Sequence, residues 1–123
     1  TSVGSWNHNI PRTQGVETGP FPDMFRGPYA GMSNAGELYA KDVKDTIDFC
    51  TAGNIALFMA EPLSVGGLVP QPVGFINEAS EHARAAGGLY LSDEVQTGFG
   101  RTGSHYWGFE MLGTKPDIVS MAK

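Results

Sequence analysis

The stretch LYLSDEVQTGFGRTG, residues 89–103, decides the fold. It opens on a short apolar run that predicts a strand over 89–95, and this run leads into two adjacent carboxylates, Asp93 and Glu94. Residues 98–103 then fit the pattern G-x-G-x-x-G letter by letter. The chemistry of this stretch could therefore lie in a dinucleotide-binding glycine turn or in the acidic pair that precedes it.

The segments around this strand alternate in type. Residues 54–62 are a short apolar run that predicts a strand buried on both faces, and residues 73–86 predict a helix closed by Gly87 and Gly88. Residues 105–113 predict a short helix or turn, and residues 117–122 a further strand. The apolar stripe of the 73–86 helix consists of Phe75, Ile76, Ala79, Ala83 and Ala86. This order is typical of an α/β fold with a parallel sheet and flanking helices.

The first part of the chain differs in composition. Residues 1–33 are rich in Gly, Pro, Ser and Thr and predict irregular structure, which leaves 34–123 as the α/β segment. A helix over 34–53 is predicted to begin with a capping-box-like pair, Asn34 and Glu37. Its apolar positions are Leu38, Val43, Ile47 and Cys50. Cys50 is the single cysteine of the chain, and we expect it to serve in packing.

Composition excludes several classes of function. The net charge is −5 and the eight Lys and Arg residues are scattered, so no basic stripe is present that could bind a nucleic acid. The longest apolar run, 55–60, is far shorter than the roughly 20 residues that cross a bilayer. The histidines show no ligand spacing, and one cysteine makes no metal pattern, so no metal site is expected. The chain begins with Thr1, and we expect it to be a segment of a longer protein.

The dinucleotide interpretation meets a physical objection. In a dinucleotide-binding turn the first glycine directly follows the strand, and the next helix offers its N–H groups to the pyrophosphate. Here Asp93 and Glu94 lie between the apolar part of the strand and the glycines. At an effective dielectric near 20, like charges about 4 Å apart repel by roughly 4 kcal/mol. A nicotinamide-dependent oxidoreductase is therefore the weaker alternative.

The other interpretation begins with strand ends. Right-handed crossovers place the carboxyl ends of parallel strands at one edge of the sheet, where ligands usually bind. Glu61, Asp93 and Lys123 lie at those ends. Asp93 and Lys123 could form a structural ion pair in a non-catalytic module. Alternatively, they could be the carboxylate and Schiff-base lysine that hold pyridoxal phosphate (PLP).

A family resemblance favours the second alternative. The segment DEVQTGFGRTG (93–103), followed by WGFE (107–110) and KPDIVSMAK (115–123), resembles the cofactor-lysine region of the class III, or ω, aminotransferases. These are PLP enzymes of fold type I. Residues 60–95 resemble the preceding βαβ segment of the same family. TSVGSWN (1–7) and PDMFRGPYAG (22–31) most resemble its mitochondrial alanine:glyoxylate branch.

The resemblance implies roles for individual residues. Asp93 would bind the pyridine nitrogen, Gln96 would donate to the phenolic oxygen, and Lys123 would carry the cofactor and later move the substrate proton. Glu61 matches an acid near the cofactor pocket, although capping of the next turn would explain it nearly as well. Glu94 and Arg101 are expected to be structural.

The resemblance also implies a reaction and its setting. Residues 1–123 would be part of the PLP-binding large domain of a mitochondrial homo-oligomeric transaminase, which moves an amino group from a donor such as alanine to glyoxylate or pyruvate. Other class III chemistries, such as ω-amino acid transamination or aminomutation, remain alternatives. The family's phosphate-binding turn and stacking aromatic would precede Thr1, so the segment alone is expected to be inactive. One departure is Ser64, which stands where many members carry glutamine.

Overall fold

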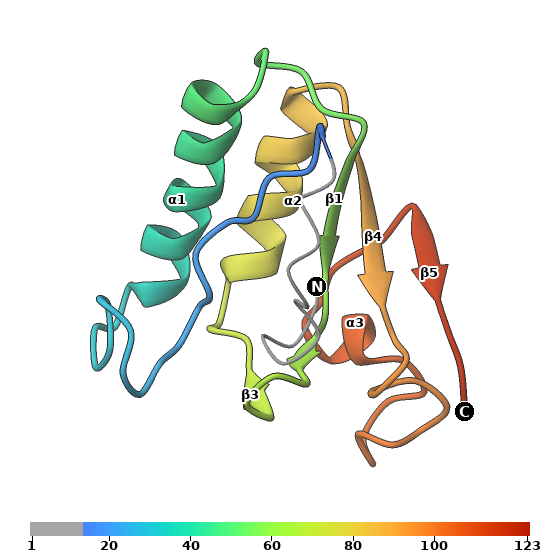
Figure 1. The fold of residues 1–123 in the computed structure, drawn as a ribbon. Coiled ribbons are helices and arrows are strands. Elements are labelled where there is room, and N and C mark those ends of the chain that lie inside the picture. Colours follow the sequence, from blue (N-terminus) through green and yellow to red (C-terminus); the bar gives the residue numbers. More distant parts are fainter. Residues whose placement is uncertain (1–13) are drawn as a thin grey trace.

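The computed structural model describes residues 14–123, so the predictions made for 1–13 lie outside the described residues. Helices alternate along the chain with the three strands of the main sheet (Figure 1). Their order is α1 (Ala35–Cys50), β1 (Leu57–Ala60), β2 (Leu63–Ser64), β3 (Val69–Pro70), α2 (Phe75–Ala85), β4 (Leu89–Asp93), α3 (Gly108–Met111) and β5 (Ile118–Ser120). The predicted alternation is confirmed, with element ends that differ from the expected ones by a few residues.

Three strands form the main sheet in the order β1-β4-β5, with β4 in the middle. Both pairings are parallel: Leu57 pairs with Leu89 at the start of β1, and Asp93 pairs with Ser120 at the end of β5. The helix α2 connects β1 to β4, and all three arrows in Figure 1 point the same way. The prediction of a parallel α/β sheet is therefore confirmed, and the carboxyl ends of its strands meet at one edge.

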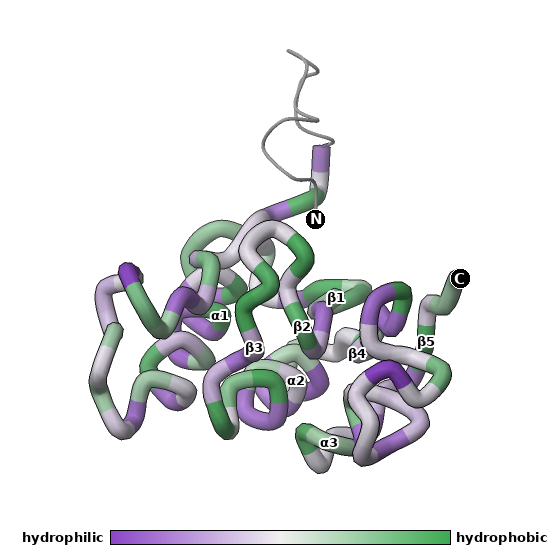
Figure 2. The backbone as a smooth tube through the Cα atoms, turned by 90° about the horizontal axis from the view of Figure 1, so that it is seen from below, coloured by the Kyte–Doolittle hydropathy of each residue, from purple (hydrophilic) through white to green (hydrophobic). Residues whose placement is uncertain are grey.

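The core lies between the sheet and α2, with α1 packed alongside α2 (Figure 2). The predicted apolar stripe of α2 is confirmed, because Phe75, Ile76, Ala79 and Ala83 are buried and Ala86 packs against the core. From the sheet, Tyr90 and Ala60 point into the same cluster. Burying such side chains is the main stabilising term, at about 25 cal/mol per Å² of apolar surface.

The end of α2 follows from its two glycines. Gly87 has φ +81°, a left-handed conformation that costs glycine little because it has no Cβ. The N–H of Gly88 donates to the carbonyl of Ala83 at 2.9 Å, and the N–H of Gly87 donates to that of Arg84 at 2.9 Å. This is a Schellman cap. It turns the chain back toward the start of β4.

Two expectations for α1 are wrong. Asn34 is the N-cap residue, but its side chain makes no capping hydrogen bond, so the predicted capping box is not formed. Cys50 is exposed rather than packed. Cys50 is the last residue of α1 and follows Ile47, the last buried residue of the helix, so the packed stripe ends before it. The two helices run side by side (Figure 1).

The described residues leave one face of the sheet exposed, so the prediction that β1 is buried on both faces is wrong here. Residues paired in register share a face, which places Leu57, Met59, Leu89 and Ile118 together. They are 40%, 43%, 48% and 42% exposed, respectively. The helix α2 covers only the opposite face (Figure 2).

The remaining described segments are mostly irregular. Residues 14–33 contain turns without helix or strand, as predicted, and Tyr29 among them packs edge-on against Tyr39 with ring centroids 4.8 Å apart. The segment between β1 and α2 contains the small antiparallel hairpin β2–β3, which was not predicted. No helix in the described part of the chain is long and apolar enough to span a membrane.

Candidate active site

The candidate site lies at the carboxyl edge of the sheet. The central strand β4 ends at Asp93, with β1 on one side and β5 on the other. Glu61 follows the last residue of β1, and Lys123 follows β5 by a short extended segment. The three residues predicted from strand ends are therefore brought to the same edge. Gln96 lies in the turn directly after β4.

Asp93 is held by its own turn. It is half-buried, and its Oδ1 accepts a hydrogen bond from the Val95 N–H at 3.1 Å. Strand alternation places its side chain on the open face of the sheet, the face that also carries Leu91. Within the described residues, Asp93 Oδ2 accepts no hydrogen bond. The side-chain amide of Gln96 neither donates nor accepts one there. Both groups have capacity left for a ligand.

Lys123 is exposed, and its backbone has φ +67°. Its carbonyl oxygen accepts a hydrogen bond from Arg101 Nη2 at 2.6 Å, while Arg101 Nη1 donates to the Gly98 carbonyl at 2.7 Å. Arg101 thus bridges the segment after β4 and the segment after β5, which agrees with its expected structural role. No ion pair joins Lys123 to Asp93 among the residues the structure describes. The structural ion pair considered above is therefore not formed here.

Glu61 supports the hairpin that follows β1. Its Oε2 accepts a hydrogen bond from the Val65 N–H at 2.8 Å, and its carbonyl accepts one from Gln71 Nε2 at 2.9 Å. This contact corresponds to the turn-capping explanation. The role of Glu61 near a cofactor stays a prediction.

Glu94 points away from Asp93, into the interior. Its side chain is 0% exposed, and its oxygens accept hydrogen bonds from Ser92 Oγ, Thr97 Oγ1 and the backbone N–H groups of Gly108 and Phe109. The expectation of a structural role is confirmed. Its partners in the α3 segment could not be predicted, because they lie 14 and 15 residues further along the chain.

The glycine-containing loop does not form a dinucleotide-binding turn. Gly98 packs against Trp107, and a Cβ at this position would lie 2.7 Å from Cζ3 of the indole. Gly100 and Gly103 adopt φ +77° and +81°, and the loop closes on itself through the Gly100 N–H and the Tyr106 carbonyl at 2.9 Å. The next helix, α3, begins only at Gly108. No helix N-terminus directly follows the glycines to receive a pyrophosphate.

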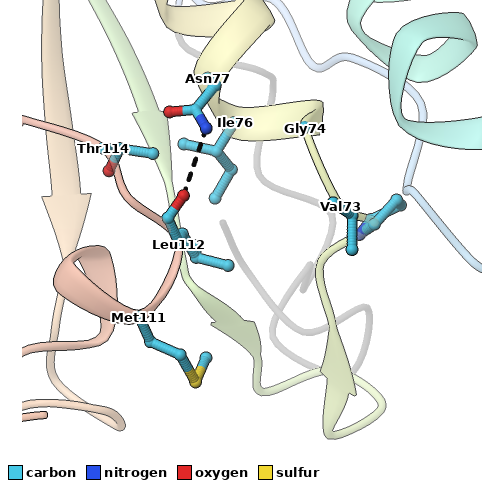
Figure 3. A pocket seen from close by; sticks show the side chains of 8 residues that line it. Val73, Gly74, Ile76, Asn77, Met111, Leu112 and Thr114 are labelled. Carbon is cyan, nitrogen blue, oxygen red and sulfur yellow. Dashed lines mark hydrogen bonds between the residues drawn. The ribbon is translucent and has the colours of Figure 1, made fainter.

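A cavity of about 210 Å³ lies elsewhere, between the start of α2 and α3 (Figure 3). Val73, Ile76, Met111 and Leu112 give it apolar walls, and Asn77 Nδ2 donates to the Leu112 carbonyl at 3.2 Å across one side. None of the predicted site residues lines it. In residues 14–123, no group of three His, Cys, Asp or Glu side chains is arranged to hold a metal ion.

Comparison with known proteins agrees with this geometry. The family model described as aminotransferase class-III matches residues 6–123. The chain belongs to the class-III aminotransferase family. Among curated class-III relatives, human mitochondrial alanine–glyoxylate aminotransferase 2 is 41% identical, and the homolog 2 of that enzyme from Arabidopsis thaliana is 42% identical. Each alignment covers 100% of this chain but only 28% and 25% of the relative, so the chain spans about a quarter of their length.

Solved structures of other proteins show the same fold. An (S)-enantioselective ω-transaminase from Thermomicrobium roseum superposes with a TM-score of 0.84 at 32% identity, over 96% of this chain and 27% of that one. A phospholyase from Arthrobacter, solved with phosphoethanolamine, gives a TM-score of 0.78 at 36% identity, over 92% of this chain and 28% of that one. Class-III aminotransferases are PLP enzymes, so the family implies this cofactor.

The residues of this chain fit that cofactor. PLP needs a carboxylate for its ring nitrogen, a hydrogen-bond donor for its ring oxygen and a lysine amine. Asp93, Gln96 and Lys123 carry a carboxylate, an amide and an amine at one edge of the sheet, and their side chains have capacity for a ligand. The acid that could have competed, Glu94, is turned inward and fully hydrogen-bonded.

Proposed function

We propose that this chain is part of the PLP-binding large domain of a transaminase, which moves an amino group from a donor such as alanine to a keto acid such as glyoxylate or pyruvate. The observation that supports this most is the placement of Asp93, Gln96 and Lys123 at the carboxyl edge of the β1-β4-β5 sheet. The names of the curated relatives support alanine and glyoxylate as substrates and a mitochondrial location. We also propose that the full-length protein forms a homo-oligomer.

Each residue has a separate task in this proposal. When bound, PLP supplies an electron sink next to the reacting carbon of the substrate. Asp93 would keep the ring nitrogen protonated through a charge-assisted hydrogen bond, worth roughly 1.5–3 kcal/mol. Gln96 would donate to the ring oxygen and fix the tilt of the ring. Lys123 would hold the cofactor covalently and, once its amine is released, move the proton at the substrate carbon as general base and acid.

Substitution of Lys123 tests the assignment. In the full-length enzyme, Lys123→Ala should abolish the borohydride-reducible adduct and lower the rate of amino transfer by on the order of 10²–10⁴-fold, because the general base is lost. Absorbance changes with alanine, reversed by glyoxylate, measure the two half-reactions. Lys115→Ala is the matched control, since Lys115 is also exposed and lies just before β5. Unchanged transfer in a folded Lys123→Ala protein would contradict the assignment.

A lyase is the second candidate, and one observation favours it. The Arthrobacter structure with 36% identity and a TM-score of 0.78 is named a phospholyase. The same residues could hold PLP for elimination as well as for transfer, because both reactions begin with proton removal next to the cofactor. Release of inorganic phosphate from phosphoethanolamine, without alanine-dependent transfer to glyoxylate, would decide for the lyase.

A further inference from the structure

Glu94 is a buried acid without a basic partner. Its carboxylate is 0% exposed, and no ion pair in the described part of the chain includes it. A buried charge is costly unless hydrogen bonds replace the lost water. Here they do: Oε1 accepts from Ser92 Oγ at 3.0 Å and from the Phe109 N–H at 2.8 Å. Oε2 accepts from Thr97 Oγ1 at 2.5 Å and from the Gly108 N–H at 2.7 Å.

These four donors come from two places in the chain. Ser92 and Thr97 flank Glu94 in β4 and its turn, while Gly108 and Phe109 begin α3. The carboxylate therefore fastens the turn after β4 to the start of α3 across the intervening glycine loop. The fit is tight, because a Cβ on Gly108 would lie 2.7 Å from Thr97 Cβ and 2.9 Å from Pro62 Cβ.

The backbone of Glu94 is fixed as well. Its N–H donates to the Ser120 carbonyl of β5 at 2.9 Å, and its carbonyl accepts from the Gly98 N–H at 2.8 Å. Side chain and backbone together hold the segment between Asp93 and Gly98. That segment includes Gln96. Its first peptide unit, which joins Asp93 to Glu94, orients Asp93. The side chains of Asp93 and Glu94 point to opposite faces of the sheet, as successive residues of a strand do.

From these contacts, and on the basis of the function proposed above, we propose that Glu94 is a positioning residue for the cofactor. By fastening the 93–98 segment to α3, Glu94 sets where the Asp93 carboxylate and the Gln96 amide meet the ring. It touches neither cofactor nor substrate. If the fastening is weakened, Asp93 retains its charge but loses its alignment with the ring nitrogen.

The test uses full-length holoenzyme with two test substitutions and two control substitutions. In Glu94→Gln, the amide can satisfy only one of the two backbone N–H groups, because its –NH₂ would face the other one. Thr97→Val keeps the shape of the side chain but removes one donor. Thr97→Ser keeps the hydroxyl and should behave as wild type. Asp117→Asn is the control for loss of a carboxylate, because Asp117 bonds the Tyr90 N–H near the other end of β4.

Three measurements separate positioning from simple stability. We expect the apparent dissociation constant for PLP to rise about tenfold in Glu94→Gln and severalfold in Thr97→Val. The ¹⁵N resonance of labelled PLP should move toward that of an unprotonated ring nitrogen in both variants, but not in Thr97→Ser or Asp117→Asn. Hydrogen exchange at the Gly108 and Phe109 amides of the apoprotein should speed up in the first two variants.

The outcomes are distinguishable. If Glu94→Gln does not fold, the pair Thr97→Val and Thr97→Ser decides. Unchanged ring-nitrogen resonance and PLP affinity in folded variants, whether or not their thermal stability drops, would overturn the positioning role. A wild-type enzyme that does not bind PLP at all would overturn the proposed function instead. In that case, faster exchange at Gly108 and Phe109 would support only the fastening itself.

Discussion

Asp117 shows how a single residue ties the start of β4 to its neighbours. Its Oδ2 accepts a hydrogen bond from the Tyr90 N–H at 2.8 Å and another from Arg84 Nη2 at 3.3 Å. The Tyr90 N–H, followed by the positive charge of Arg84, lowers the pKa of Asp117 below its ordinary value. The carboxylate therefore stabilises the fold only while it is ionised.

The pH dependence follows from this direction. A lowered pKa means that the contribution of Asp117 is complete above the ordinary pKa of an aspartate and is lost as the pH falls through the folded-state pKa. We expect Asp117→Asn to lower the thermal midpoint of the full-length apoenzyme at pH 7. The difference from wild type should shrink as the pH falls through the lowered folded-state pKa of Asp117, because the wild-type carboxyl then becomes neutral as well. A difference that stays constant over this pH range would contradict the expectation.

Tyr90 is a buried residue that contributes to the core mainly through its ring. It is 0% exposed, and its hydroxyl has no hydrogen-bond partner among residues 14–123, although the Ser92 and Thr114 side chains lie near it. Burial raises the pKa of this phenol, with a smaller opposing effect from those two side chains. Tyr90 therefore contributes to the core as a large ring rather than through its hydroxyl.

At the scale of elements, the contact between α3 and the turn after β4 depends on a missing side chain. Gly108 is buried, and a Cβ there would meet Thr97 Cβ and Oγ1 at 2.7 Å. We expect Gly108→Ala to lower the free energy of unfolding by about 1–3 kcal/mol, as overpacking does. Urea denaturation of the full-length protein measures this loss.

Gly66→Ala is the matched control. Gly66 lies in the β2–β3 hairpin, and a Cβ there would come no closer than 4.0 Å to Ser64 Oγ. This substitution should change the free energy of unfolding by less than about 0.5 kcal/mol, as is usual for open surface positions. Equal losses in Gly66→Ala and Gly108→Ala would show that the close approach at α3 is not the cause.

At the scale of the whole molecule, the main open question concerns the exposed apolar face of the sheet. Parallel sheets are normally covered on both faces, yet Leu57, Met59, Leu89 and Ile118 are all more than a third exposed. The chain spans about a quarter of its curated relatives, 28% of the human one. We expect the rest of the protein to cover this face.

Substitutions on this face should act in opposite ways on the short chain and the whole protein. Met59→Lys should reduce self-association of the isolated 123-residue chain in sedimentation experiments, because it breaks an exposed apolar patch. In the full-length protein the same change should be destabilising, because it would bury an unpaired charge. Leu68→Lys is the control, since Leu68 is 70% exposed in the hairpin. A full-length Met59→Lys protein as stable as wild type would contradict coverage of this face.

Much of the fold could be predicted from local patterns. The stripe of α2 and its Gly87-Gly88 cap are local, because helix periodicity and a left-handed glycine act within a few residues. The short apolar runs located β1 and β4 for the same reason. The predictions failed where contacts in space decide, as with Cys50, which continues the apolar spacing of α1 in the sequence but is exposed at the end of the helix.

The sequence alone was enough to place Glu61, Asp93 and Lys123 at one edge, because parallel strands joined by right-handed crossovers end together. Its motifs also indicated the family, which the comparisons confirmed. Only the tertiary structure decided which of the two acids of DEVQTGFGRTG faces the open side of the sheet and which is buried. Alternation along β4 turns Asp93 outward and Glu94 inward, and the inward acid is satisfied by N–H groups 14 and 15 residues away. Such a partnership depends on how the glycine loop closes, and no local pattern specifies that.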